Sequence, residues 1–215
     1  MSAVVKLPRA FKALDMPVTF THFKDLKANT KTERELKHFR DLVEIIDQTQ
    51  GKTKAALPLL SFAKFGDKRT DKGSYRHDAN VIRLYAITGD HDHGTMTIEE
   101  GQSRLARYSI AAMFHTTPSH TASAPRWRVF CPLMKPVREE EYKALAGLLN
   151  GFLSGELAAQ SFVLSQSYYY GHVEGVEYQT AIVDTADTLD MPDRYMSEVL
   201  PRPLPRAATR RLPER

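Results

Sequence analysis

The sequence predicts an α+β protein in which helices cover one face of an antiparallel sheet. From Val81 onward, apolar runs and amphipathic stretches follow one another in the order strand, helix, strand, strand, helix, strand. That order is typical of the βαββαβ split unit of RRM-like folds. We therefore predict an N-terminal α/β part over residues 1–80, an RRM-like part over residues 81–200, and a tail over residues 201–215.

The N-terminal part is predicted to contain a strand, a helix and a second strand. The first strand lies near residues 18–20. Between residues 32 and 48, apolar side chains recur at three- and four-residue spacing, which predicts a helix with one buried face that ends before Gly51. Residues 57–65 form an apolar run, which predicts a buried strand.

The RRM-like part supplies the six elements of the split unit. They are a strand over residues 81–87, a helix from residue 97 to about residue 113, strands over 111–116 and 127–133, a helix over 138–152, and a sixth element that is expected as a pair of strands over 163–173 and 176–183. Thr97 and Glu100 have capping-box spacing, and Glu139 and Lys143 have the spacing of a supporting ion pair. The proline- and arginine-rich tail predicts a linker or disorder.

The composition is that of a globular protein with a modest excess of positive charge. The 215 residues include 42% hydrophobic and 26% charged residues, with a net charge of +4. No apolar run reaches the roughly 20 residues that span a bilayer, so no membrane partner is expected. With a single cysteine in the chain, a reducing cytoplasm is the expected compartment. The lone Cys131 excludes an internal disulfide, and its apolar neighbours predict a core position.

Two acidic residues stand at the end of an apolar strand. Asp90 and Asp92 are two residues apart, so their side chains are expected on one face of the sheet, with Cα atoms about 7 Å apart. Carboxylates in this arrangement can share divalent cations, and oxygen ligands favour Mg²⁺ or Mn²⁺. Gly89 and Gly94 beside them would let a triphosphate approach the backbone. A zinc site built on His91 and His93 is the weaker alternative, because further metal-ligand spacing is missing.

Groups that suit phosphates follow downstream. Ser119 and His120 lie in the loop after one predicted strand, and Arg126 and Arg128 start the next. A histidine can donate to a phosphate oxygen, and arginines can bind a triphosphate in bidentate fashion. We interpret Asp90, Asp92 and His120 as candidate catalytic residues, and Ser119, His120, Arg126 and Arg128 as candidate nucleotide-binding residues.

A cluster of basic residues precedes the acidic strand. Lys68, Arg69, Lys72 and Arg76 share a segment with glycines and aromatic residues. Such a segment can track a nucleic-acid backbone, although a solvated charged loop explains it equally well. We interpret these four residues as candidate nucleic-acid contacts.

Taken together, the motifs resemble the catalytic domain of the archaeo-eukaryotic primase superfamily. Asp-x-Asp at a strand end, then Ser-His, then Arg-x-Arg on the next strand are similar to the primase-polymerase domains of phage and plasmid replication proteins. The resemblance covers roughly residues 57–171 and includes Phe65-Gly66, residues 76–80 and residues 164–169. It implies that Asp90 and Asp92 bind the metals and that His120 holds the phosphates of the incoming nucleotide.

The same resemblance implies binding partners and a host organism. They are single-stranded DNA template, nucleoside triphosphates, Mg²⁺ or Mn²⁺, and a fused or separate helicase, in a bacterial host with a phage- or plasmid-encoded gene. The expected function is template-dependent nucleotidyl transfer by a DNA primase or DNA-directed polymerase.

The third acidic motif of the family departs from its usual form here. Ala158 stands where an aspartate is expected, so Glu156 or Asp184 is considered as a replacement metal ligand. The departure favours a first alternative, a non-catalytic module that binds single strands or origins. A second alternative is a metal-dependent phosphohydrolase or nuclease that uses the same acids.

Overall fold

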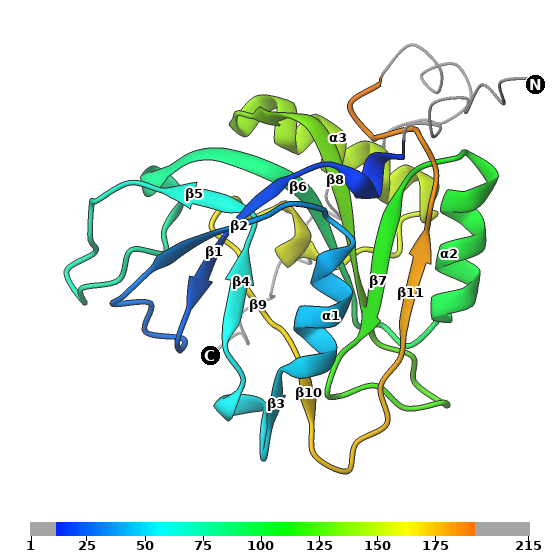
Figure 1. Ribbon diagram of the computed structural model, residues 1–215, viewed down its shortest axis with the longest axis horizontal. Coiled ribbons are helices and arrows are strands. Elements are labelled where there is room, and N and C mark those ends of the chain that lie inside the picture. The colour runs from blue at the N-terminus through cyan, green and yellow to red at the C-terminus, as the bar shows by residue number, and fades with distance from the viewer. Residues whose placement is uncertain (1–11, 192–215) are drawn as a thin grey trace, which may run out of the picture.

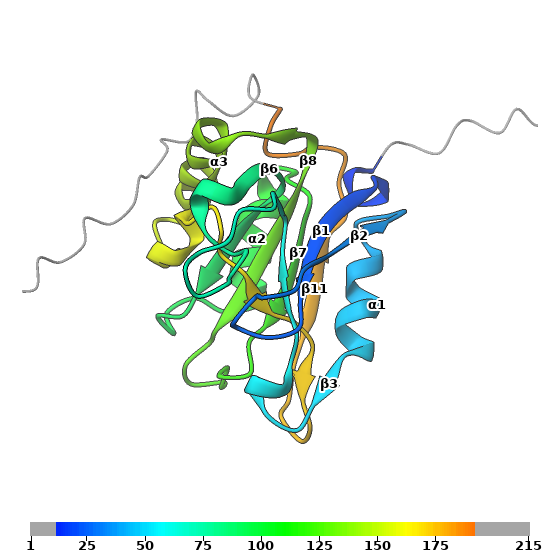
Figure 2. The ribbon, with the colours of Figure 1, turned by 90° about the vertical axis from the view of Figure 1, so that its left-hand side faces the viewer.

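The computed structural model describes residues 12–191, which form three layers. A five-stranded sheet lies in the middle, as Figures 1 and 2 show. Helices α2 (Ile98–Arg107) and α3 (Glu139–Phe152) cover one face of it. A four-stranded sheet and helix α1 (Asp41–Gln48) lie against the other face. Buried apolar side chains fill both interfaces.

The central sheet contains the predicted split unit. Its antiparallel strands lie in the order β11-β7-β8-β6-β5. Their bounds are Ala63–Phe65 for β5, Val81–His91 for β6, Ala112–Thr116 for β7, Trp127–Val137 for β8 and Thr180–Val183 for β11. Because β8 pairs with both β6 and β7, it separates the two strands that α2 connects. The predicted α+β fold class is confirmed.

The last strand of the central sheet lies at the edge formed by β7. β11 is antiparallel to β7, whereas β5 pairs with the outer side of β6. β5 and β11 are therefore the two edge strands of the central sheet.

The second sheet combines distant parts of the chain. Its order is β2-β1-β4-β9. The strands are β1 (Val18–Phe23), β2 (Thr32–Leu36), β4 (Leu59–Ser61) and β9 (Tyr168–Tyr169). The two-residue strands β3 (Gln50–Gly51) and β10 (His172–Val173) form a parallel pair. Short 3₁₀ helices complete the elements: η1 (Ala13–Asp15), η2 (Lys54–Ala56), η3 (Asp78–Asn80) and η4 (Ala159–Phe162).

The predicted helix over residues 32–48 is wrong in its first part. Thr32–Leu36 form strand β2, which pairs along its length with β1. Only Asp41–Gln48 are helical, with Leu42 and Ile46 buried. The helical spacing is therefore real in the second half, whereas pairing with a neighbouring strand overrides it in the first.

Three further expectations about elements are corrected. The run over residues 57–65 divides into β4 and β5, which belong to different sheets, and the buried Phe62 lies at the crossing. Helix α2 ends at Arg107 instead of near residue 113, because a turn with Ser109 at a positive φ of 57° follows it and β7 starts at Ala112. The final strands do not pair with each other: β9 pairs with β4, β10 with β3, and β11 with β7.

Several local signals give the expected structure. The Thr97 hydroxyl accepts a hydrogen bond of 3.1 Å from the Glu100 backbone N–H and caps α2. Helix α3 covers nearly all of the range predicted for it. Cys131 is fully buried, as its neighbours suggested.

The predicted tail, the membrane-spanning potential and the predicted division of the chain complete the comparison with the sequence. The tail over residues 201–215 lies outside the described residues. No helix within residues 12–191 is long and apolar enough to cross a membrane. The division of the chain at residue 80 stays a prediction; β5 and β6, on either side of it, pair in one sheet.

Candidate active site

One cavity brings together six of the residues that the sequence singled out. It has a volume of about 250 Å³, and residues from β6, from the loop before β8, and from the segment that contains β9 line it. The predicted residues in its lining are Arg76, Asp90, Asp92, Ser119, Arg126 and Arg128. Acidic and basic side chains thus share one hollow.

Asp90 is held from several sides at the end of β6. Its backbone N–H donates to the Ser161 hydroxyl at 2.9 Å, and its backbone carbonyl accepts from the Ala158 N–H at 2.8 Å. Its carboxylate accepts from Arg128 Nε at 2.9 Å and from Gln160 Nε2 at 2.7 Å. The side chain is only 9% exposed, so the protein fixes the direction of both carboxylate oxygens.

Asp92 lies just after the end of β6 and turns toward the same place. Gln160 Nε2 is 3.4 Å from Asp92 Oδ2 while it contacts Asp90 Oδ2. One amide nitrogen therefore lies within reach of an oxygen of each carboxylate. The two acids leave the strand on the same side, which is the geometry that their spacing predicts.

Arg128 is engaged by the protein itself. Besides its ion pair with Asp90, its Nη1 donates to the Tyr169 carbonyl at 2.6 Å, and its guanidinium lies 4.9 Å from the centre of the Tyr168 ring. It therefore joins β8 of the central sheet to β9 of the second sheet. This position makes Arg128 a group that positions Asp90 more than one that is free to bind a triphosphate.

Arg76 and Arg126 reach the same cavity from other directions. Arg76 donates to the Ser167 hydroxyl at 2.9 Å and to the Leu26 carbonyl at 3.2 Å, and its burial lowers the pKa of its guanidinium. Arg126 lines the cavity at the start of β8. Lys54 of η2 adds a further cation, 5.8 Å from the Tyr169 ring.

His120 does not line the cavity that contains the two aspartates. Its ring lines a second cavity of about 320 Å³, which also contains Glu99 and Gln179. Its Nδ1 accepts from the Arg126 backbone N–H at 3.1 Å. Ser119, its neighbour in sequence, lines the first cavity, so the two adjacent residues line different cavities.

Neither candidate for a replacement third acid lies in the cavity. Glu156 accepts a hydrogen bond from the Thr95 hydroxyl and lies 3.9 Å from His91 Nδ1. Asp184 forms ion pairs with Lys12 and Arg40. Within residues 12–191, no group of three or more His, Cys, Asp or Glu side chains is arranged to hold a metal.

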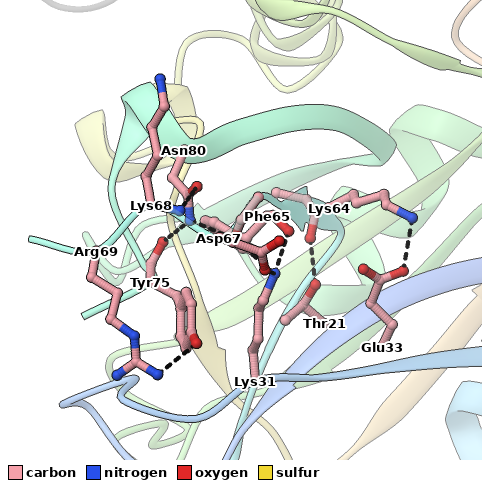
Figure 3. A network of polar contacts seen from close by, with 12 residues as sticks. Thr21, Lys31, Glu33, Lys64, Phe65, Asp67, Lys68, Arg69, Tyr75 and Asn80 are labelled. Carbon is pink, nitrogen blue, oxygen red and sulfur yellow. Dashed lines mark hydrogen bonds and ion pairs between the residues drawn. The ribbon is translucent and has the colours of Figure 1, made fainter. Parts of the chain in front are cut away.

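Lys68, Arg69 and Lys72, three of the predicted nucleic-acid contacts, belong to a separate loop before η3, and Figure 3 shows Lys68 and Arg69. Asn80 holds this loop by accepting from the Lys68 N–H at 3.1 Å and donating to the Tyr75 carbonyl at 2.7 Å. Arg69 donates to the Tyr75 hydroxyl at 2.6 Å, and Figure 3 shows Arg69 and Lys31 on the two sides of the Tyr75 ring. Lys72 is exposed. The loop therefore presents ordered positive charge, whereas Arg76 belongs to the cavity.

Two features of the site were missed or misread in the sequence. Gln160 gave no signal by itself, although it lies beside the segment aligned with the third acidic motif. Gly89 was expected to let a triphosphate approach, but a Cβ there would lie 2.8 Å from side-chain atoms of Leu157 and Val129. Gly89 is therefore required by packing against the segment that carries Gln160.

A buried histidine beside the site predicts a pH dependence of stability. His115 of β7 lies opposite Arg128 of β8, and burial, followed by the charge of Arg128, lowers the pKa of His115 from 6.5 to about 3. Between these two values the unfolded chain binds a proton that the folded chain does not bind. The free energy of unfolding should therefore fall as the pH drops below 6.5.

Replacing His115 with leucine should remove this contribution. From pH 7 to pH 4.5, the free energy of unfolding of the wild type should fall by about 2–3 kcal/mol more than that of His115→Leu. Urea denaturation at both pH values measures the difference. Equal losses in the two proteins would show that His115 does not titrate as described.

One family model and one solved structure are similar to this chain. Residues 65–162, a little under half of the chain, match the family model of the VapE N-terminal domain. These residues lie within the stretch of roughly residues 57–171 that the sequence analysis compared with primase-polymerase domains. No curated protein matches the chain. Among solved structures, it is similar to the AEP domain of the primase-polymerase of cyanophage S-2L, with 11% identity, a TM-score of 0.41, and coverage of 81% of this chain and 84% of that one.

Proposed function

We propose that this chain, which matches the VapE N-terminal domain over residues 65–162, catalyses template-dependent nucleotidyl transfer as a DNA primase or DNA-directed polymerase. The main support is the composition of one cavity, which Asp90 and Asp92 share with Arg126 and Arg76. Nucleotidyl transfer requires carboxylates for divalent cations and positive groups for the triphosphate. Both kinds of group line this hollow.

Mg²⁺ or Mn²⁺ fits the two carboxylates. An oxygen of Asp90 and an oxygen of Asp92 both lie within reach of the single Gln160 Nε2, so they converge on one region. Proteins commonly hold Mg²⁺ with one or two carboxylates and leave the other positions to water and substrate phosphates. A cation bound there would stabilise negative charge on the reacting phosphate.

The basic and hydroxyl side chains would hold the substrate. We assign the triphosphate to Arg126, Arg76 and Ser119, which line the cavity with the acids. Holding the α-phosphate in line with the attacking 3′-hydroxyl lowers the entropic cost of the reaction. His120 lines the neighbouring cavity, so its phosphate-binding role is the less supported part of the proposal.

The loop that carries Lys68, Arg69 and Lys72, just before η3, is our candidate for the template interface. Lys68, Arg69 and Lys72 supply its positive charge. Contacts of this kind release counterions from the nucleic acid, so binding to single-stranded DNA should weaken steeply with salt. A fused or separate helicase would deliver such a strand, and a gene product that continues into a helicase would support that arrangement.

A primer-extension and de novo priming assay with wild-type protein tests the function. The protein is incubated with a primed or unprimed single-stranded template, nucleotides, and Mg²⁺ or Mn²⁺. Products whose sequence follows the template are expected. Degradation of the template would instead indicate a nuclease, and the absence of any product would reject polymerase activity.

A non-catalytic module that binds single strands or origins is the second candidate. Two observations favour it: Arg128 already neutralises one oxygen of Asp90, and Ala158 stands where the family carries an acid. Tight, salt-sensitive binding of single-stranded DNA without templated product in the same assay would select this candidate.

A further inference from the structure

The side chain of Gln160 occupies the point on which the two aspartates converge. Its Nε2 is 2.7 Å from Asp90 Oδ2 and 3.4 Å from Asp92 Oδ2. Among the described hydrogen bonds, no other side chain contacts both carboxylates. Gln160 is therefore placed where a cation shared by the two acids would be coordinated.

This placement is built into the backbone around Gln160. The short helix η4 is tied to β6 by the Ala158 N–H, which donates to the Asp90 carbonyl, and by the Ser161 hydroxyl, which accepts from the Asp90 N–H. Ser161 is fully buried, and its carbonyl accepts from the Tyr142 hydroxyl at 2.9 Å. Gln160, which lies between these anchors, is thus directed at the acids by fixed contacts on both sides.

An amide can serve two states of such a site. Its nitrogen donates to carboxylates, and a half-turn about its last bond presents its oxygen in the same place. Amide oxygens are ligands for Mg²⁺ and Mn²⁺, as carboxylates are. We propose that Gln160 is a neutral third ligand of the divalent cation held by Asp90 and Asp92. It would replace the acidic ligand that was expected at position 158, where the chain has an alanine.

The proposal rests on the metal site of the proposed function and sharpens it. Two carboxylates beside Arg128 give the site less negative charge than three carboxylates would. The cation should therefore bind weakly when no nucleotide is present. A negative charge at residue 160 should strengthen binding, because Coulomb attraction to the cation increases.

Direct binding of Mn²⁺ to the full chain tests this assignment without any assay of activity. Electron paramagnetic resonance of free Mn²⁺ gives the dissociation constant for wild type, Gln160→Ala and Gln160→Glu. We expect Gln160→Ala to weaken binding about tenfold or more, and Gln160→Glu to tighten it by a similar factor. Thermal unfolding checks that each variant folds.

Gln179→Ala is the matched control. Like the amide of Gln160, its amide donates to a carboxylate at 2.7 Å. The acceptor is Glu99 alone, and both residues line the other cavity. It should leave the dissociation constant unchanged. Binding that is lost in Asp92→Asn but equal in wild type and both Gln160 variants would overturn the role of Gln160 alone. No Mn²⁺ binding by the wild type would overturn the metal site together with it.

Discussion

Asp92→Asn is expected to reduce templated nucleotide incorporation by about 1000-fold or more, because metal stabilisation worth several kcal/mol is lost and each 1.36 kcal/mol is tenfold in rate. The substitution keeps the size of the side chain and removes its charge. Asp92 is partly exposed and its described contact with Gln160 is long, so folding should be preserved. Rates of primer extension with Mg²⁺ and with Mn²⁺ measure the effect.

The choice of Asp92 over Asp90 matters for this test. Loss of the Asp90 carboxylate would leave the buried Arg128 without its partner, so lost activity would be confounded with lost stability. Asp47→Asn makes the same chemical change on the exposed side of α1 and should keep the wild-type rate. Wild-type rates in Asp92→Asn would show that the two acids do not bind the catalytic metals.

Arg128→Leu is expected to lower the free energy of unfolding by about 3–5 kcal/mol, because it leaves the buried Asp90 carboxylate unpaired. The two side chains are 8% and 9% exposed and lie 2.9 Å apart. The substitution also removes the hydrogen bond to the Tyr169 carbonyl, which connects the two sheets. Urea denaturation at neutral pH gives the difference from wild type.

Two further variants separate the ion pair from its surroundings. Arg126→Leu removes a partly exposed arginine that directly precedes β8. It should change the free energy of unfolding by no more than about 0.5 kcal/mol. The double variant Asp90→Asn, Arg128→Leu should recover part of the loss, since the unpaired charge is gone. If Arg128→Leu cost no more than Arg126→Leu, the ion pair would not be a buried one in solution.

Local patterns in the sequence predicted much of the central sheet and its helices. The capping signal at Thr97 and the apolar runs before Asp90 and after Arg126 depend on neighbouring residues, and the structure contains the corresponding elements. The second sheet could not be predicted in this way. Its β2 strand is defined by pairing with β1, and β9 by pairing with β4, more than one hundred residues earlier in the chain.

The site was predicted in part for the same reason. The spacing of Asp90 and Asp92 is a property of one strand, so it could be interpreted directly. Whether Arg128 binds substrate or Asp90 depends on how two strands are paired, and the direction of the His120 ring depends on the loop around it. Gln160 acquires its position only because η4 is anchored to β6.

The exchange of strands between the two sheets has a consequence for synthesis of the protein on the ribosome. β5 from the N-terminal part completes one sheet, and β9 from the C-terminal part completes the other. The pairing of β9 with β4 joins segments more than one hundred residues apart, so it forms slowly, because a long loop must close before it is made. The hollow that holds the acids can therefore be completed only after translation has passed Tyr169, and until then β4 lacks its partner β9 in the second sheet.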